Sequence, residues 1–440
     1  MRSQLLFLEL NELNLESVAF YCARGLLPTF DRLIARHGLS RTVSESVYEN
    51  IEPWIQWVTV HTGKSYADHK IFRLGDIVKH DIPQIWEQLE TLGLRVGAIS
   101  PMNAKHRVRQ PAFFVPDPWT RTQITARPIL RGLYEAVVQA VNDNAQSRVT
   151  AASAMKLLVG AMVYARPANY AQYLKLAAGS RSRSWRKAML LDLLLADVFV
   201  REVRRTRPDF ATLFLNAAAH IQHHYMFSSV AYRGQRRNPE WYVRPNEDPV
   251  LEVYRLYDRI VSAVLREFPN VRLMIATGLH QDPYEDVTFY WRLRDHGEFL
   301  RKIQVPFRRV EPRMSRDFMV ECESEEEARV AEQVLKQAIV SDNTPLFMVD
   351  NRGRDLFVTL TYPKQIGPEL TFRIGDRVYA DLHKDVAFVA IKNGHHNGIG
   401  YFLDTHAQAG DVPEEFPLSS VPDRIMSALG LSGAASRAAA

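Results

Sequence analysis

The chain has 440 residues, of which 46% are apolar and 24% are charged, a composition typical of a globular enzyme. A chain of this length can bury a large core, and it forms either one large domain with insertions or two or three smaller domains. The net charge of +5, from 55 basic and 50 acidic residues, is too small to indicate a nucleic-acid-binding protein, and no recognised nucleic-acid-binding module is present. Cys22 and Cys322 lie far apart in the sequence, which excludes a disulfide framework and a CxxC metal site.

The apolar segments are too short to cross a membrane. The residues that follow Met1 lead directly into the apolar run Leu5–Leu8, which Glu9 interrupts, so no signal peptide is visible. The longest other apolar stretch is Leu157–Ala165, well below the roughly 20 residues of a membrane-spanning helix. The sequence therefore predicts no transmembrane segment and, by default, a reducing cytoplasmic location, and it leaves the oligomeric state open.

Basic residues are concentrated between Arg181 and Arg207. This segment holds eight basic residues against three acidic ones. Such a patch can attract a phosphate, a polyanion or an acidic membrane surface, and the alternative is an ordinary solvated helical face.

The first part of the chain alternates apolar strands with helices. Leu5–Leu10 is predicted to be a buried strand, and Asn14–Arg36 a helix that Gly25–Pro28 interrupts. The segment Ile85–Leu92 is predicted to be the next helix and Val96–Ser100 a second short strand.

The same alternation continues after residue 187. Ala188–Arg207 carries an apolar stripe at helical spacing and ends before a proline, and Phe210–Leu215 is predicted to be the next strand. Val250–Phe268 is a further amphipathic helix, and Val271–Thr277 a further strand. This order predicts the α/β class, with a doubly wound, mostly parallel sheet sandwiched by helices, and ligands at the carboxyl ends of the strands.

Two stretches depart from this alternation. Residues 125–187 are rich in Ala, Leu and Arg, which predicts a helical cap insertion, and residues 311–375 read as a strand, an acidic helix and a hairpin, which predicts a small α+β insertion. The α/β core would then comprise residues 1–124, 188–310 and 376–425, and residues 426–440 would form a disordered tail.

The order of several short motifs resembles that of a known family. Gly25–Leu33 (GLLPTFDRL) is similar to G-x-L-P-T-x-D-x-L, and Thr62 and Gly63 followed by His69 resemble T-G-x(5)-H. Four segments carry the resemblance to the alkaline phosphatase superfamily, in particular its type I phosphodiesterase and nucleotide pyrophosphatase branch: Leu5–Glu12, Pro53–His69, Leu215–Tyr225 and Gly394–Phe402. The resemblance implies an α/β sandwich and metal-assisted transfer of phosphoryl or sulfuryl groups, with two metal ions roughly 4 Å apart.

Only two of the family's metal ligands are matched in this chain. The last His of the family falls on His396 and the His of its Asp–x3–His pair on His223, but the Asp of that pair falls on Ala219. The Asp of the first strand falls on Asn11, beside Glu12, and a one-residue shift of the alignment would place Glu12 or His280 as a ligand. The family's later Asp-His pair falls at Thr277–His280, where by spacing neither ligand is matched.

The family's nucleophile is also unmatched. By spacing it falls on Pro53, and the polar neighbours Asn50 and Glu52 are not family nucleophiles. This composition permits attack by an activated water rather than a covalent phospho-enzyme, with Glu52 as a base or Asn50 orienting the water.

Six of the 14 histidines follow predicted strands and are expected at one rim of the sheet; they are His220, His223, His224, His280, His395 and His396. Histidine is a common metal ligand and proton-transfer group, so the cluster predicts a rearranged metal site, and the alternative is a set of polar rim and core histidines.

These observations predict a metal-dependent hydrolase or transferase of phosphoric or sulfuric esters with a rearranged site. The predicted ligands of a divalent Zn or Mn ion are His223, His396, Asn11, Glu12 and His280, and the predicted catalytic residues are Glu52, Asn50 and His220. The expected partner is an anionic small molecule or phosphoester. The alternative is a catalytically inactive relative that binds an anionic ligand or a partner protein.

Overall fold

The computed structural model describes residues 4–142, 150–313 and 316–431. The chain divides into two compact units. The first unit takes in Met1–Tyr134, Lys156–Pro283 and Gly394–Ala440, and the second takes in Glu135–Met155 and Tyr284–Asn393.

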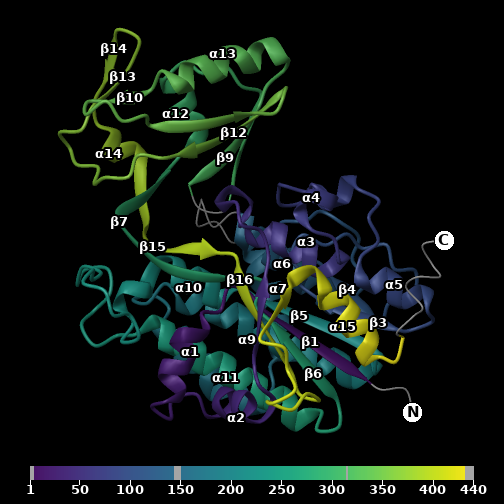
Figure 1. The fold of residues 1–440 in the computed structure, drawn as a ribbon. Helices are drawn as coiled ribbons and strands as arrows, with labels where there is room; N and C mark the ends of the chain where they lie inside the picture. Colours follow the sequence, from purple (N-terminus) through teal and green to yellow (C-terminus); the bar gives the residue numbers. More distant parts are fainter. Residues whose placement is uncertain (1–3, 143–149, 314–315, 432–440) are drawn as a thin grey trace. The chain divides into compact units, whose positions relative to one another are not determined.

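The first unit is built on an eight-stranded sheet with the strand order β17-β2-β16-β6-β1-β5-β3-β4 (Figure 1). Five neighbouring strands, β6-β1-β5-β3-β4, are parallel, and β16 is antiparallel to both β6 and β2. The bounds of these strands are β1 Leu5–Leu10, β2 Ser40–Val43, β3 Val96–Ile99, β4 Phe113–Val115, β5 Phe210–Leu215, β6 Arg272–Ala276, β16 Ile399–Asp404 and β17 Glu415–Pro417. The predicted α/β class with a mostly parallel sheet between helices is confirmed.

Helices cover both faces of this sheet. On one face α11 packs against α2, α9 and α10, and on the other α15 packs against α3 (Figure 1). The second face encloses a core of large side chains that includes Trp57, Trp86 and Phe214. The helices are α1 Leu15–Cys22, α2 Pro28–His37, α3 Pro53–Thr62, α4 Tyr66–His69, α5 Ile85–Thr91, α8 Tyr170–Gly179, α9 Arg186–Thr206, α10 Ala217–Tyr225, α11 Pro249–Glu267 and α15 Val421–Ala428.

Local sequence explains where these helices begin and end. Proline occupies the first turn of α2, α3 and α11, where its missing N–H costs no hydrogen bond. Asp248 caps α11 by accepting the Leu251 N–H at 2.9 Å, and Gly63 ends α3 in the left-handed conformation.

The second unit contains an antiparallel sheet in the order β11-β12-β9-β8, with α13 packed on β11 and β12. A three-stranded sheet, β10-β13-β14, shares its apolar core. The elements are β8 Arg309–Pro312, β9 Asp317–Glu321, β10 Ile339–Val340, β11 Phe347–Asn351, β12 Asp355–Leu360, β13 Phe372–Ile374, β14 Arg377–Tyr379, α12 His296–Lys302, α13 Glu325–Lys336 and α14 Leu382–Asp385.

Four further elements contain residues of both units. The strands β7 (His280–Leu293) and β15 (Val386–Asn397) pair in a two-stranded sheet, and the helices α6 (Pro128–Asn142) and α7 (Ala151–Tyr164) belong to the stretch predicted to be a helical insertion.

The proposed domain boundaries remain predictions. The predicted small α+β insertion, residues 311–375, lies inside the longer segment Tyr284–Asn393 of the second unit, because that unit includes parts of β7 and β15. Of the predicted tail, residues 426–428 complete α15 and Met426 is buried, whereas residues 432–440 lie outside the described part of the chain.

The basic segment that begins at Arg181 is partly used for structural contacts. Arg183 pairs with Glu247, and Arg186 pairs with Glu252, in each case at 2.6 Å. Arg201 donates to the carbonyl oxygens of Tyr164 and Ala165. Within residues 4–142, 150–313 and 316–431, none of the helices has the length and apolar character needed to cross a membrane.

Candidate metal centre

The carboxyl end of β1 places Glu12 between the ends of two neighbouring strands. The Asn11 N–H donates to the Leu215 carbonyl at the end of β5, and the Glu12 N–H donates to the Thr277 carbonyl just after β6, both at 3.1 Å. Glu12 has a φ of 58°, in the left-handed region, so the chain turns sharply at this residue. Its side chain is 2% exposed.

Two histidines reach Glu12 from different elements of the first unit. His223 lies on α10, the helix that follows β5, and His396 lies near the end of β15 (Figure 1). The expectation that His395 and His396 follow a strand is wrong, since both residues belong to β15. The cause is Gly394, a residue type that commonly marks a loop but here lies within the strand.

The three side chains bring one donor atom each to a common point. The Glu12 Oε2 atom lies 3.1 Å from His223 Nε2 and 3.2 Å from His396 Nε2, and the two Nε2 atoms lie 3.1 Å apart. Donor atoms at the corners of a tetrahedron around Zn²⁺, each about 2.0–2.1 Å from the metal, would lie about 3.3 Å apart. The observed triangle therefore needs almost no adjustment to hold such an ion.

The other ring nitrogens face groups that orient the two imidazoles. His396 Nδ1 lies 3.4 Å from Glu52 Oε2, and His223 Nδ1 lies 3.4 Å from the Gly394 carbonyl oxygen. Metal-binding histidines usually direct their second nitrogen to a carboxylate or a carbonyl in this way, which fixes the tautomer and leaves the Nε2 lone pair for the metal.

Amide side chains hold the carboxylate of Glu12 in place. Asn11 Nδ2 donates to Glu12 Oε1 at 2.8 Å, and Gln281 Nε2 donates to Glu12 Oε2. Burial alone would raise the pKa of Glu12, but the nearby imidazoles of His396 and His223 outweigh burial and hold that pKa well below its usual range. Burial likewise disfavours a charged His396, but the carboxylates of Glu12 and Glu52 raise the pKa of His396 to about 8.

Two predicted ligands do not supply a donor atom to this triangle. Asn11 accepts the Trp57 indole N–H through Oδ1 at 2.6 Å, and its amide nitrogen donates to Glu12 and Asn216. The ring nitrogens of His280 lie 2.6 Å from the Ile399 carbonyl and 3.1 Å from Asp282 Oδ1. Direct coordination by either residue stays a prediction, and in this structure Asn11 orients Glu12 instead.

The predicted catalytic residues lie at different distances from the triangle. Glu52 contacts His396 directly and its side chain is 31% exposed. His220 is an exposed residue of α10, one turn before His223, and its ring lies 5.0 Å from that of His224. Asn50 ends a short 3₁₀ turn, and its carbonyl accepts a hydrogen bond from Gln56. Glu52 therefore contacts the triangle directly, and His220 interacts electrostatically with His223.

The residues that support the triangle include two glutamines that sequence reasoning missed. Gln222 donates to the Glu12 carbonyl at 2.7 Å and accepts the Asn14 N–H at 3.1 Å. Gln281, which is fully buried, donates to the Ala219 carbonyl at 3.0 Å as well as to Glu12. A glutamine neither titrates nor belongs to a metal-ligand motif, so the sequence offered no signal for either residue.

The donor set fits one metal ion. Two imidazoles and one carboxylate form the set that many catalytic zinc sites use, with a fourth position left to water or substrate. In the described part of the chain, Glu12, His223 and His396 are the one group of three or more His, Cys, Asp or Glu side chains whose donor atoms converge closely enough for a metal. Within the residues that the structure describes, this group therefore offers a site for one metal ion.

Comparisons with known proteins give similarity of structure only. No family model matches the chain, and no curated protein matches it in sequence. The chain is similar to phosphonoacetate hydrolase from Sinorhizobium meliloti 1021 in complex with phosphonoformate, with 13% identity, a TM-score of 0.48, and coverage of 97% of this chain and 96% of that chain. It is also similar to murine ectonucleotide pyrophosphatase/phosphodiesterase 5 in complex with AMP, with 10% identity, a TM-score of 0.46, and coverage of 98% and 96%.

A third similar structure is TAB5 alkaline phosphatase with Mg bound, with 7% identity, a TM-score of 0.41, and coverage of 98% of this chain and 99% of that chain. These three structures are each less than 25% identical to this chain and have TM-scores below 0.5. At such low identities and TM-scores they say nothing about the chemistry of this chain, so we infer its function from its own side chains.

Proposed function

We propose that this protein is a metal-dependent hydrolase of phosphoric or sulfuric esters whose active site is rearranged around a single divalent ion. Glu12, His223 and His396 would hold the ion. The observation that carries the proposal is the triangle of donor atoms, 3.1–3.2 Å on each side, with both Nδ1 atoms directed to acceptors. Imidazole and carboxylate donors suit Zn²⁺, and Mn²⁺ is the second candidate.

The ion, when bound, supplies Lewis-acid chemistry that polarises a phosphoryl or sulfuryl oxygen and acidifies a water. The protein's part is to hold the three donors rigidly. Asn11 and Gln281 fix the Glu12 carboxylate, and the Gly394 carbonyl and Glu52 orient the two imidazoles. This support limits the reorganisation that binding of a charged ester would otherwise need.

Glu52 is the proposed base. It directly precedes α3, where the residue that aligns by spacing with the family's nucleophile is Pro53, which has no hydroxyl or thiol. An attacking water would form the new bond to phosphorus or sulfur and give its proton to the Glu52 carboxylate, while the ester bond breaks and the leaving alcohol takes a proton from solvent. His220 and Asn50 remain candidates for proton transfer and for orienting the water.

A catalytically inactive relative is the second candidate. The observation that favours it is the 3.1 Å separation of His223 Nε2 and His396 Nε2, because a shared proton would satisfy the two rings and the adjacent Glu12 carboxylate without a metal. In that case the site would bind an anionic ligand or a partner protein and would not catalyse hydrolysis.

Calorimetric titration separates the two candidates. The chelator-treated protein is titrated with Zn²⁺ and with Mn²⁺ beside the His223→Ala/His396→Ala double variant and a His406→Ala control, which removes an exposed imidazole elsewhere. We expect one ion per chain to bind with micromolar or tighter affinity, to be lost in the double variant and to be retained in the control. Absence of binding, or binding that the double variant keeps, would contradict the proposal.

Activity is then measured on aryl phosphate monoesters, phosphodiesters and sulfate esters. Hydrolysis that requires the added metal and falls in Glu52→Gln supports the enzyme. Metal binding without hydrolysis of any of these ester classes would instead favour the inactive relative.

A further inference from the structure

Helix α7 presents its bulky apolar side chains to solvent. Leu158, Val159, Met162 and Val163 recur at helical spacing, and their exposed fractions range from 37% for Val163 to 71% for Met162. An amphipathic helix of a globular protein normally turns such a stripe toward the core. The apolar stripe of α7 therefore faces solvent, which is opposite to the orientation expected of a helix that packs only against its own protein.

The face of α7 that packs inward is lined by a small residue and a tyrosine. Gly160 lies so close to Leu133 of α6 that an added Cβ would approach Leu133 Cδ1 to 2.7 Å, and Tyr164 is fully buried. Rotating the helix to bury its bulky stripe would lose both contacts. The exposure of Leu158 and Met162 is thus a consequence of close packing on the opposite side of the helix.

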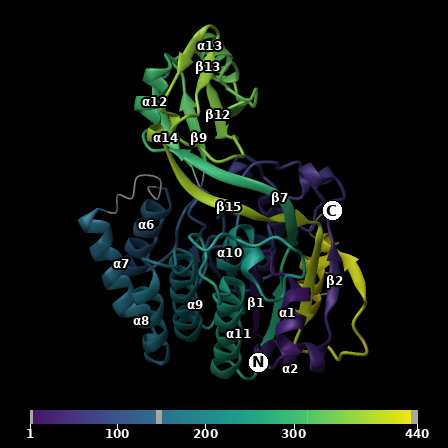
Figure 2. The same ribbon diagram turned by 90° about the vertical axis from the view of Figure 1, so that its left-hand side faces the viewer.

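The next helix, α8, also exposes apolar side chains. The chain passes from α7 into α8 through residues 165–169 (Figure 2). Helix α8 exposes Tyr170 and Leu174, which are one turn apart and 51% and 72% exposed. We define the helical apolar surface as Leu158, Val159, Met162 and Val163 of α7 with Tyr170 and Leu174 of α8.

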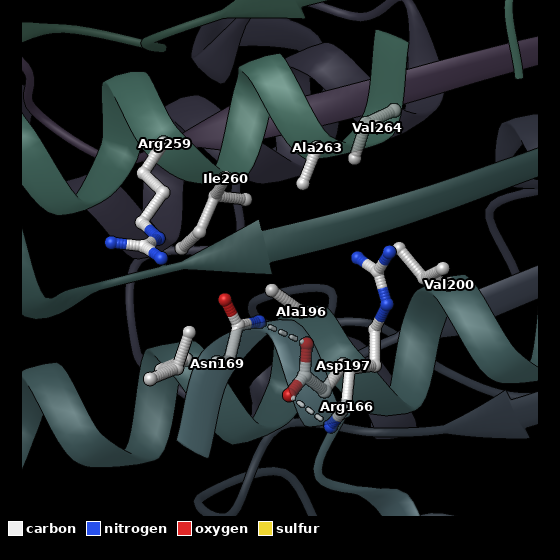
Figure 3. A pocket seen from close by; sticks show the side chains of 10 residues that line it. Arg166, Asn169, Ala196, Asp197, Val200, Arg259, Ile260, Ala263 and Val264 are labelled. Atoms are coloured by element: carbon white, nitrogen blue, oxygen red, sulfur yellow. Dashed lines mark hydrogen bonds between the residues drawn. The ribbon is translucent and has the colours of Figure 1, made fainter. Parts of the chain in front are cut away.

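The connection between the two helices is firmly anchored. Asp197 of α9, 1% exposed, accepts the Arg166 N–H at 2.8 Å, the Asn169 amide at 2.7 Å and the Tyr173 hydroxyl at 3.0 Å. Figure 3 shows the first two of these bonds beside a cavity of only about 10 Å³, lined in part by Ile260 of α11. Because the connection is hydrogen-bonded to the core of the first unit, the fold holds the helical apolar surface in a fixed position.

The chain segment that carries this surface has only basic residues among its charged side chains. Between residues 156 and 187 the sequence contains seven basic residues and no acidic residue. The partly buried Arg166, Arg183 and Arg186 pair with glutamates outside this segment. Lys175, Arg181 and Lys187 are exposed. Lys156 lies at the border of the α7 stripe, where a lysine can keep its ammonium group in water beside an apolar contact.

We infer that the helical apolar surface docks on an anionic lipid membrane surface. Its side chains would enter the boundary between headgroups and acyl chains, and the exposed basic residues would contact anionic headgroups. The exposed Tyr170 suits that boundary as well. A second copy of the chain is the less favoured occupant, because the exposed basic residues of two identical segments would repel each other.

Vesicle co-sedimentation tests the inference. The full chain is mixed with vesicles of phosphatidylcholine alone or of phosphatidylcholine and phosphatidylserine, at low and at high salt. We expect binding to the phosphatidylserine vesicles that weakens in high salt. Met162→Glu and Leu174→Glu should each lower the partition coefficient at least about tenfold, whereas Val378→Glu, a change at an equally exposed residue of β14, should leave the partition coefficient unchanged.

The basic residues are tested with a charge-conserving control. Replacing Lys175 and Lys187 by glutamate should weaken vesicle binding at least about fivefold for each residue changed, and replacing both by arginine should preserve binding. Melting temperatures of all variants report whether they fold. Equal binding to both vesicle types, no binding to either, or an equal loss in Val378→Glu would overturn the inference, and so would a dimer in sedimentation velocity that Met162→Glu abolishes.

Discussion

Replacement of Gly394 by alanine should disturb the candidate metal centre through a residue that does not bind the metal. Gly394 lies in β15 beside Gln281, and a Cβ added to Gly394 would overlap Gln281 Oε1 and lie 3.2 Å from the Gln222 carbonyl oxygen. Gln281 is fully buried, so its amide cannot move into solvent. The displaced amide would no longer donate to Glu12.

Two effects of different size follow from this displacement. Overpacking of a buried site costs about 1–3 kcal/mol of unfolding free energy. Loss of a group that orients a metal ligand lowers metal affinity about 10- to 100-fold. We therefore expect Gly394→Ala to fold with reduced stability and to bind Zn²⁺ about 10- to 100-fold more weakly than the original chain.

Urea unfolding and calorimetric titration measure the two effects. Gly410→Ala is the matched control, because a Cβ there meets nothing within 4 Å. The double variant Gly394→Ala/Gln281→Ala should bind Zn²⁺ no more weakly than the weaker of the two single variants, since both changes remove the same hydrogen bond. Fully additive losses of affinity, or a Gly394→Ala variant that behaves like Gly410→Ala, would refute the reasoning.

Three further changes test other parts of the structure. Trp57→Phe leaves the buried Asn11 Oδ1 atom without its 2.6 Å donor, so we expect the free energy of unfolding in urea to fall by about 1–3 kcal/mol. Trp54→Phe is the control, because the Trp54 N–H donates to the Phe72 carbonyl at an exposed position, and its loss should cost about 1 kcal/mol or less. Burial raises the pKa of Asp192 from an ordinary 3.8 to about 6, so the folded chain keeps a proton that the unfolded chain releases; this contribution to stability is complete below pH 3.8 and is lost as the pH rises through 6. Measured by urea unfolding, the free energy of unfolding of Asp192→Asn should rise by about 3 kcal/mol relative to that of the original chain between pH 3.8 and pH 6. A difference between the two chains that does not change with pH would contradict the raised pKa of Asp192. Glu52→Gln should lower ester hydrolysis about 10²- to 10⁴-fold while one Zn²⁺ still binds per chain, and an unchanged rate would exclude Glu52 as the base.

The parallel sheet could be predicted because its strands are buried on both faces. The runs Leu5–Leu10 and Phe210–Leu215 are continuous apolar or nearly apolar segments, and the helices before and after them carry clear apolar stripes. The predicted helix Val250–Phe268 agrees to within one residue at each end with α11, Pro249–Glu267.

The ligand at the end of β1 could not be fixed by the same reasoning. Asn11 and Glu12 are adjacent, and which side chain faces the two histidines depends on the left-handed turn at Glu12. That turn is stabilised by backbone hydrogen bonds to Leu215 and Thr277, which lie more than 200 positions away in the sequence. A local sequence pattern therefore cannot predict the turn.

The exposure of the apolar stripe of α7 could not be predicted from the sequence, for a related reason. A helix rich in Leu, Met and Val is normally expected to be buried. Its orientation is decided by Gly160 and Tyr164, which pack inward, and the contact between Gly160 and Leu133 is a property of the tertiary structure.

X-ray absorption spectroscopy at the zinc edge tests the central claim most directly. The chelator-treated chain is loaded with one equivalent of Zn²⁺, and the first coordination shell is compared with that of the His223→Ala/His396→Ala variant. If Glu12, His223 and His396 bind the ion, the shell contains nitrogen and oxygen donors at about 2.0–2.1 Å. The spectrum also shows scattering from the outer ring atoms of two imidazoles, and this scattering is lost in the double variant. A shell containing sulfur, a shell without imidazole, or a spectrum that is the same in both chains would contradict a metal centre at these three residues.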